Sequence, residues 1–195
     1  MFFRCFTEKN DIIGIVLENC EGSILEADPN LVSEETMWLF LESMSNALSY
    51  LHSKNILHRD IKPNNVLYKS YPGGGLELKL TDFGMATYNE HIDPNDSVGT
   101  TLFLSPEALS KRPYGKPTDI WSLGVTTASI CNLESLFKNR TEISNWTGNE
   151  NPIKNVSKFS LDLQLLVMKM LSPLPENRPT AEEILMIASS KRLLL

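Results

Sequence analysis

Apolar residues recur three or four residues apart in one long stretch of the first half of the chain. The spacing predicts one face of an amphipathic helix, formed by Met37, Leu41, Met44, Leu48 and Leu51. Ser33 is suited to cap its N-terminus, and acidic residues follow directly, where they favour a helix start. We therefore expect a long helix from Ser33 that delivers the chain to His58.

Three further helices are predicted in the second half of the chain. Residues Asp119 to Cys131 are apolar nearly all round, which is typical of a helix buried at the centre of a helical lobe. Leu161 to Leu171 and Thr180 to Ile187 are amphipathic, and Pro179 and Thr180 open the last of them.

Aromatic and β-branched runs predict two pairs of strands. Phe2 to Phe6 and Asp11 to Glu18 are joined by a polar turn. Val66 to Tyr68 and Leu76 to Leu80 flank the glycine-rich segment Tyr71 to Gly75, which is typical of a β-hairpin with a loose loop. The pattern as a whole predicts an α+β protein, mostly helical with two small hairpins.

Composition narrows the class of protein. The 195 residues suit one globular domain, with a formal charge of -6 and a pI near 5.1, which argues against nucleic acid or an anionic membrane as the main partner. No apolar run approaches the roughly 20 residues that span a bilayer. Cys5, Cys20 and Cys131 are far apart, so neither a disulfide framework nor a zinc site is suggested. A reducing compartment follows, the cytoplasm first and the nucleus as the alternative.

The residues with the clearest chemistry surround the second hairpin. Residues 58–65 read H-R-D-I-K-P-N-N, and Asp82-Phe83-Gly84 follows the hairpin. Antiparallel pairing would bring Asn65 and Asp82 to the same end, where their oxygens suit Mg²⁺. Asp60 would accept or orient a hydroxyl proton, and Lys62 could reach a γ-phosphate. The alternative, a charged surface loop, is disfavoured by the joint pattern.

These motifs resemble those of the protein kinase superfamily, in its serine/threonine branch. Residues 99–107, G-T-T-L-F-L-S-P-E, are similar to the family segment G-T-x-x-Y-x-A-P-E, with Phe103 and Ser105 as departures. The resemblance implies a kinase-like fold, ATP and Mg²⁺ as cofactors, and a protein substrate. It also implies that Thr100 and Lys62 contact the catalytic Asp60.

The same resemblance assigns structural roles. Asp119 begins the segment D-I-W-S-L-G, whose aspartate ties down the catalytic-loop backbone in the family, and Arg178 should pair with Glu107. His58, Phe83 and Gly84 take structural or regulatory places in their motifs. The sequence around Ser105, Trp121 and Arg178 is similar to that of the NIMA-related branch.

Regulation is suggested by Arg59, since an arginine before the catalytic aspartate marks kinases whose activation segment is ordered by phosphate or an acidic substitute. Asp96 would mimic that phosphate, and Ser97 is a nearby residue that could be modified. A plain polar, turn-rich loop is an equal alternative.

By the same resemblance, residues 1–22 are a remnant of the upper lobe and residues 23–195 form the lower lobe. Leu17 takes the gatekeeper place, and Glu18 to Cys20 form the hinge. Glu18, Cys20 and Leu67 are implied nucleotide contacts. The glycine-rich phosphate loop and the strand lysine of the family are not found in the sequence. Lys9 is the only lysine before the hinge, and it lies in a predicted turn.

Two functions therefore compete. The chain encodes a serine/threonine kinase with a truncated upper lobe, or a pseudokinase-like module that binds partners without catalysis. Retained Asp60, Asn65 and Asp82 favour the first, and the absent strand lysine favours the second. A third hypothesis has a partner chain covering the exposed upper face.

Overall fold

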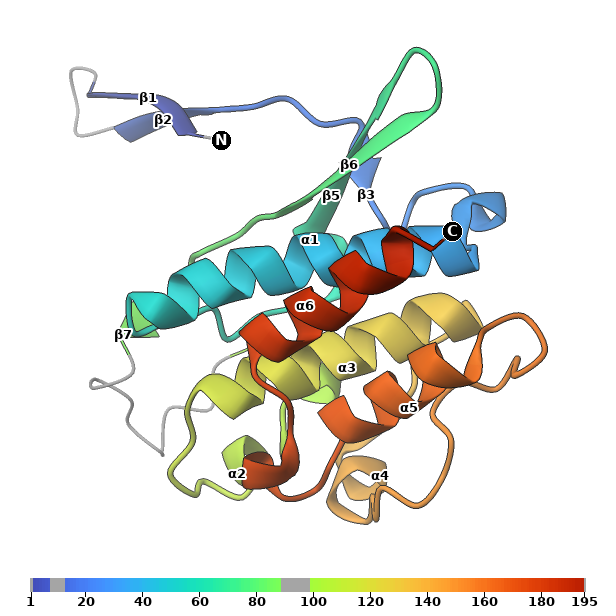
Figure 1. Cartoon of the computed structure of the whole chain (residues 1–195). Helices are drawn as coiled ribbons and strands as arrows, with labels where there is room; N and C mark the ends of the chain where they lie inside the picture. The colour runs from blue at the N-terminus through green and yellow to red at the C-terminus, as the bar shows by residue number, and fades with distance from the viewer. Residues whose placement is uncertain (1, 8–12, 89–98, 195) are drawn as a thin grey trace.

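The structure is a computed structural model that describes residues 2–7, 13–88 and 99–194 (Figure 1). Its helices are α1 (Glu34–Ser53), α2 (Pro106–Leu109), α3 (Lys116–Asn132), α4 (Arg140–Ser144), α5 (Leu161–Met170) and α6 (Ala181–Arg192). Its strands are β1 (Phe2–Thr7), β2 (Ile13–Leu17), β3 (Gly22–Ser23), β4 (Ile56–Leu57), β5 (Val66–Tyr71), β6 (Gly75–Leu80) and β7 (Thr87–Tyr88). The predicted α+β class is confirmed.

Helix α3 lies in the middle of the helical lobe, with α1 and α5 packed against it (Figure 1). Every residue from Thr118 to Cys131 is buried, as the all-round apolar pattern predicts. The helix begins at Lys116, three residues before the predicted start, because Pro117 suits the first turn, where its missing N–H leaves no bond unmade. Burial also raises the pKa of the Cys131 thiol to about 12, which disfavours the reactive thiolate form.

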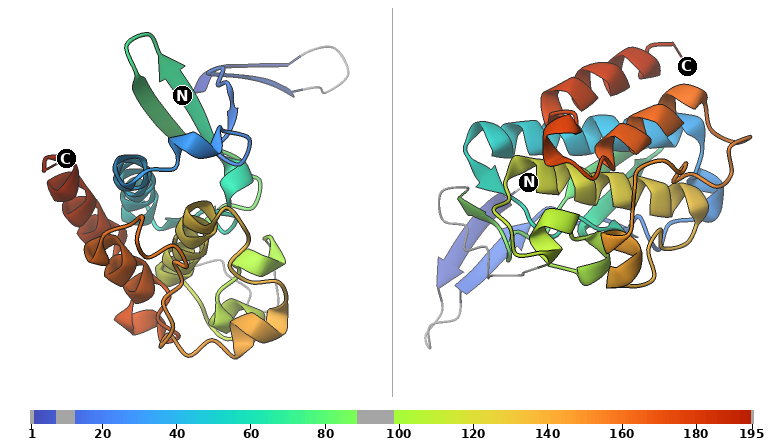
Figure 2. Two further views of the ribbon diagram at one scale, coloured as in Figure 1. Left: turned by 90° about the vertical axis from the view of Figure 1, so that its right-hand side faces the viewer. Right: turned by 90° about the horizontal axis from the view of Figure 1, so that it is seen from below.

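Helix α6 runs beside α1 on the outside of the lobe (Figure 2). Thr180 caps it in a capping box with Glu183, which confirms the predicted start. The helix continues to Arg192, beyond the predicted end at Ile187. Its last turn is polar and carries no apolar signal, and it is held instead by contacts of Ser189 and Arg192 with Glu42 on α1.

Both hairpins project from the same side of the helical lobe (Figure 1). β1 and β2 form an antiparallel pair, and β5 and β6 pair from Val66 opposite Leu80 to Tyr71 opposite Gly75. The structure adds β3 to the edge of β5 and pairs β4 with β7. Strands β3, β4 and β7 are each two residues long, too short to show an alternation of apolar and polar residues in the sequence. No helix among the described residues is both long and apolar enough to span a bilayer.

Candidate active site

The carboxylate of Asp60 lies at the centre of a dense hydrogen-bond network. Its Oδ1 accepts from the Thr100 backbone N–H at 3.0 Å and from Thr100 Oγ1 at 2.9 Å. Its Oδ2 accepts from Lys62 Nζ at 2.7 Å and from Asn65 Nδ2 at 2.9 Å. The predicted contacts of Thr100 and Lys62 with Asp60 are thus confirmed, and Lys62 also donates to Thr100 Oγ1 at 2.8 Å.

This network fixes the charge of Asp60 as well as its position. Burial raises the pKa of the carboxyl group, but hydrogen bonds from Lys62 and Thr100 outweigh that effect and leave the pKa below its usual value. Asp60 is therefore ionised at neutral pH, with both oxygens oriented by donors. A carboxylate in this state can accept a hydrogen bond from an incoming hydroxyl group.

The backbone before Asp60 is held by the buried carboxylate of Asp119. Asp119 accepts from the N–H of His58 at 3.0 Å and from the N–H of Arg59 at 2.9 Å, which confirms its predicted contact. His52, at the end of α1, adds a third bond at 2.9 Å. Sequence reasoning missed His52, because nothing local to α1 signals a partner 67 residues away.

The loop is held in a conformation that most residues avoid. Arg59 has a left-handed backbone with φ 67°. Its carbonyl oxygen lies against Gly99, where an added Cβ would approach that oxygen to 2.5 Å. Gly99 itself has φ 106°, so a side chain there is excluded by both space and backbone. The side chain of Arg59 donates to the carbonyl of Met85 at 2.6 Å.

His58 links the catalytic loop to the segment that contains Asp82. Its Nε2 lies 3.0 Å from the carbonyl oxygen of Thr81, which can only accept, so Nε2 carries the proton. Its Nδ1 then accepts from the Asp60 N–H at 3.3 Å. The ring also makes a T-shaped contact with the ring of Phe83, with 5.0 Å between centroids. Burial, as the largest cause, lowers the pKa of His58.

We expect this lowered pKa to make the fold sensitive to mild acid. The unfolded chain binds the proton more readily than the folded one, so His58 contributes stability above its ordinary pKa of 6.5. That contribution is lost as the pH falls from 6.5 toward the folded pKa. Denaturant titrations from about pH 7.5 to about pH 5.5 should show a falling free energy of unfolding.

The matched variant is His58→Gln, which keeps one side-chain donor and does not titrate. Its unfolding free energy should depend less on pH than that of the parent chain over the same interval. Parallel pH profiles for the two proteins would show that His58 is not the group responsible.

The β5–β6 pairing brings Asn65 and Asp82 to one end, as predicted. The N–H of Thr81 donates to the carbonyl of Asn65 at 2.9 Å, so Asp82 follows directly after that contact. Asp82 is exposed, has φ 63°, and its Oδ1 accepts from the Gly84 N–H at 3.2 Å. The side-chain nitrogen of Asn65 donates hydrogen bonds to Asp60, so its side-chain oxygen is the atom that could bind a metal ion.

These two oxygen donors fit a magnesium ion that arrives with phosphate groups. Mg²⁺ is commonly bound through one or two protein oxygens together with substrate phosphates. In the part of the chain that the structure describes, no group of three or more His, Cys, Asp or Glu side chains could hold a metal by itself. Asn65 and Asp82 are thus two oxygen donors of the kind that Mg²⁺ takes from a protein when phosphate groups supply other ligands.

Arg178 and Glu107 form the buried ion pair predicted between two distant segments. Nη1 and Nη2 of the arginine meet the two carboxylate oxygens at 2.6 Å and 2.8 Å. Arg178 also donates to the carbonyls of Ser172 and Pro117, and its guanidinium lies 5.0 Å from the centroid of the Trp121 ring. This pair ties the segment after Thr100 to the start of α6.

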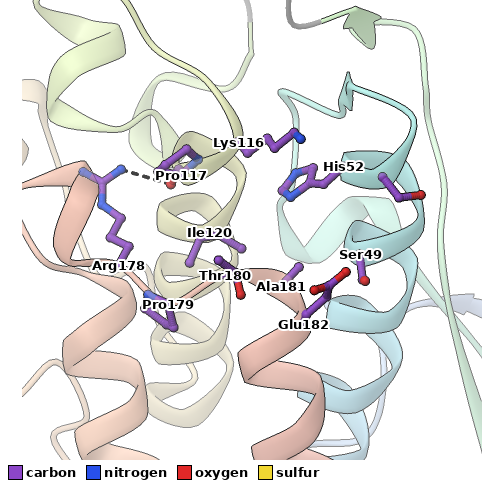
Figure 3. Close-up of a pocket in the computed structure, with 11 residues that line it drawn as sticks. Ser49, His52, Lys116, Pro117, Ile120, Arg178, Pro179, Thr180, Ala181 and Glu182 are labelled. Carbon is purple, nitrogen blue, oxygen red and sulfur yellow. Dashed lines mark hydrogen bonds between the residues drawn. The ribbon is translucent and has the colours of Figure 1, made fainter.

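A cavity of about 240 Å³ lies beside this anchor, between the end of α1 and the starts of α3 and α6 (Figure 3). Figure 3 shows the hydrogen bond from Arg178 to Pro117 on one side and the ring of His52 on the other. His52, which contacts Asp119, and Arg178, which contacts Glu107, therefore line the same cavity.

The remaining predicted residues lie on the hinge side or outside the described part. Leu67 and Cys20 are half-buried, and Cys20 is a free thiol. Glu18 does not stand alone, because lysines of β5 and β6 contact it. Asp96 and Ser97 lie outside the described residues, so their regulatory role stays a prediction.

Comparison with known proteins identifies the family of this chain. The protein kinase domain family matches residues 1–188. Mouse serine/threonine-protein kinase Nek5 is 33% identical over 195 residues, covering 94% of this chain and 30% of Nek5. Rice serine/threonine-protein kinase Nek3 is 33% identical over 188 residues, with 92% and 32% covered.

A relative outside the Nek group is similar to the same extent. Drosophila serine/threonine-protein kinase PAK mbt is 33% identical over 184 residues, with 90% of this chain and 28% of that protein covered. The chain thus spans about a third or less of the length of these curated relatives. With the geometry around Asp60, these matches show that the chain belongs to the protein kinase family, among the serine/threonine kinases that include the NIMA-related Nek proteins.

Proposed function

We propose that this chain carries the phosphoryl-transfer machinery of a serine/threonine protein kinase that uses ATP and Mg²⁺. The observation that carries the proposal is the ionised Asp60 carboxylate, oriented by Lys62 and Thr100. Phosphoryl transfer requires placement and charge compensation more than covalent chemistry. The contacts described above supply both.

Each residue then has one role. Asp60 orients the hydroxyl group of a protein serine or threonine and accepts its hydrogen bond. Lys62, already beside Asp60, presents its ammonium group to the transferred phosphate. Asn65 and Asp82 would hold the magnesium ion, which when bound neutralises phosphate charge. Thr100 holds Asp60 in place and connects it to the substrate-binding segment up to Glu107.

The hinge side completes the nucleotide site. We propose that backbone groups of Glu18 to Cys20 meet the adenine, with Leu67 beneath it. The proposal places the protein in a reducing compartment, the cytoplasm, because Cys20 and Cys131, the cysteines whose side chains the structure describes, are free thiols.

The competing function is that of a binding module without catalysis. The observation in its favour is that these 195 residues contain no glycine-rich phosphate loop and no lysine in a strand like that of V-A-I-K. The β1–β2 pair forms a sheet of its own, with Val16 and Leu17 exposed. Such a two-stranded sheet could accept strands of a partner chain along an edge.

The decisive experiment compares two preparations. The endogenous protein is purified, its intact mass is measured, and its transfer of γ-phosphate to a generic protein substrate is assayed. The 195-residue chain, of 22.0 kDa, is assayed beside it. We expect a heavier endogenous species that phosphorylates serine or threonine, and very weak or no transfer by the 195-residue chain. An endogenous species of 22.0 kDa without transfer would favour the binding module.

A further inference from the structure

Backbone hydrogen bonds join the segment just after the hinge, Glu21 to Ile24, to strand β5. Gly22 and Ser23 of β3 lie opposite Tyr68 and Leu67 of β5. Two flanking bonds extend this ladder, from the N–H of Glu21 to Tyr68 at 3.0 Å and from the N–H of Ile24 to Val66 at 2.8 Å. The residues proposed to meet adenine, Glu18 to Cys20, lie before it.

A side-chain interaction joins the hinge itself to the same hairpin. Oε1 of Glu18 lies 3.2 Å from Nζ of Lys69 on β5, and Oε2 lies 3.1 Å from Nζ of Lys79 on β6. Each carboxylate oxygen thus has its own lysine, and the two lysines come from different strands. The Glu18 side chain is only 17% exposed, so the pairs are shielded more than ordinary surface ion pairs. We call Glu18, Lys69 and Lys79 the hinge clamp.

The strand register places the hinge clamp next to the proposed nucleotide site. Lys79 lies directly opposite Leu67, and Lys69 lies opposite Glu77. Cross-strand partners, and residues two apart on one strand, share a face of a hairpin. Leu67 and both lysines are therefore on one face, and the carboxylate that contacts these lysines is held beside Leu67.

Electrostatics agree with this geometry. Hydrogen bonds from Lys79 and Lys69 lower the pKa of Glu18 to about 2. Glu21 adds a second attachment, because its Oε1 accepts from the backbone N–H and the hydroxyl of Ser70. Lys79 also pairs with Glu77, and Lys69 pairs with Glu18.

We propose that the hinge clamp positions the hinge backbone for adenine, with Glu18 as the positioning residue. Lys69 and Lys79 belong to the two strands of one hairpin, so these two partners of Glu18 are held together by the β5–β6 pairing. This inference rests on the proposed function for its reference to adenine. The ordering of the hinge by Glu18 can be tested without any nucleotide.

The test is amide hydrogen exchange across residues 18–24 in the 195-residue chain. Glu18→Gln removes the charge and keeps the shape, and we expect exchange of these amides to become about tenfold faster or more. The control is Glu134→Gln, since Glu134 forms a comparable ion pair with Lys154 on the surface. Its effect on residues 18–24 should be nil. Unchanged hinge exchange in Glu18→Gln would overturn the proposal.

A double-variant cycle identifies the partners. Lys69→Met with Lys79→Met should accelerate hinge exchange as Glu18→Gln does, and adding Glu18→Gln to that pair should change nothing more. Effects that simply add would show that Glu18 acts through other residues, and would overturn the clamp.

A binding measurement separates positioning from general stability. Glu18→Gln should weaken binding of Mg²⁺–ADP several-fold and leave binding of Mg²⁺–pyrophosphate unchanged, because only the first ligand has a base. Equal weakening of both would contradict a role in base recognition. Failure of the parent chain to bind either ligand would instead contradict the proposed nucleotide site, while hydrogen exchange would still decide whether Glu18 orders the hinge.

Discussion

Arg178→Ala is expected to lower the free energy of unfolding by about 3–5 kcal/mol, the cost of breaking a buried ion pair from one side. The substitution leaves the carboxylate of Glu107 buried without its cation, with the hydroxyl of Thr118 still donating to it. It also removes hydrogen bonds to the carbonyls of Ser172 and Pro117. Denaturant titration of the 195-residue chain measures the loss.

The matched control is Arg192→Ala, which removes an arginine from a partly exposed pair with Glu42. Pairs of that kind contribute about 0–1 kcal/mol. Arg178→Lys should fall between the two alanine variants, because an ammonium group keeps the charge but loses the two-pronged geometry. Similar losses for Arg178→Ala and Arg192→Ala would mean that the buried pair is not a main anchor.

Asp60→Asn is expected to lower the rate of phosphoryl transfer about 10²- to 10⁴-fold in whichever species of this protein is active. Each oxygen of Asp60 accepts from donors, so an amide nitrogen in either place would face an N–H or ammonium group. The variant thus loses the charge that orients the substrate hydroxyl and disturbs the network. Initial rates at saturating ATP and Mg²⁺ give the comparison.

Asp162→Asn is the control for this prediction, because Asp162 is an exposed aspartate paired with Lys191 far from the loop. Its rate should match that of the parent protein. Transfer by Asp60→Asn at the parental rate would assign the chemistry to another residue, and thermal unfolding of both variants would show whether folding contributes to the loss.

Local patterns predicted most of the fold. The apolar spacing and the cap residue placed α1, and the run of buried residues placed α3, since each signal lies within one element. The ends of helices were less predictable. The last turn of α6 is polar and depends on Glu42, which belongs to another helix, and no pattern within residues 188–192 reveals that.

The contacts at the site divide in the same way. The meeting of Asn65 and Asp82 followed from antiparallel pairing alone. The pair Glu107–Arg178 spans 71 residues and was reached only through family resemblance. The contacts of His52 with Asp119 and of Glu18 with two lysines were missed. These residues are far apart in the sequence and meet only after folding, so no sequence pattern indicates that they pair. The catalytic roles and the division at residues 22 and 23 stay predictions.

The backbones of Arg59 and Asp82 have a further consequence for how this lobe can change. A left-handed conformation costs a residue other than glycine about 1 kcal/mol or more, and both positions carry it. Aspartate tolerates this conformation better than arginine does, so the cost falls mainly on Arg59. A substitution that relaxes the backbone of Arg59 should therefore stabilise the fold while losing the contact of the Arg59 side chain with the carbonyl of Met85.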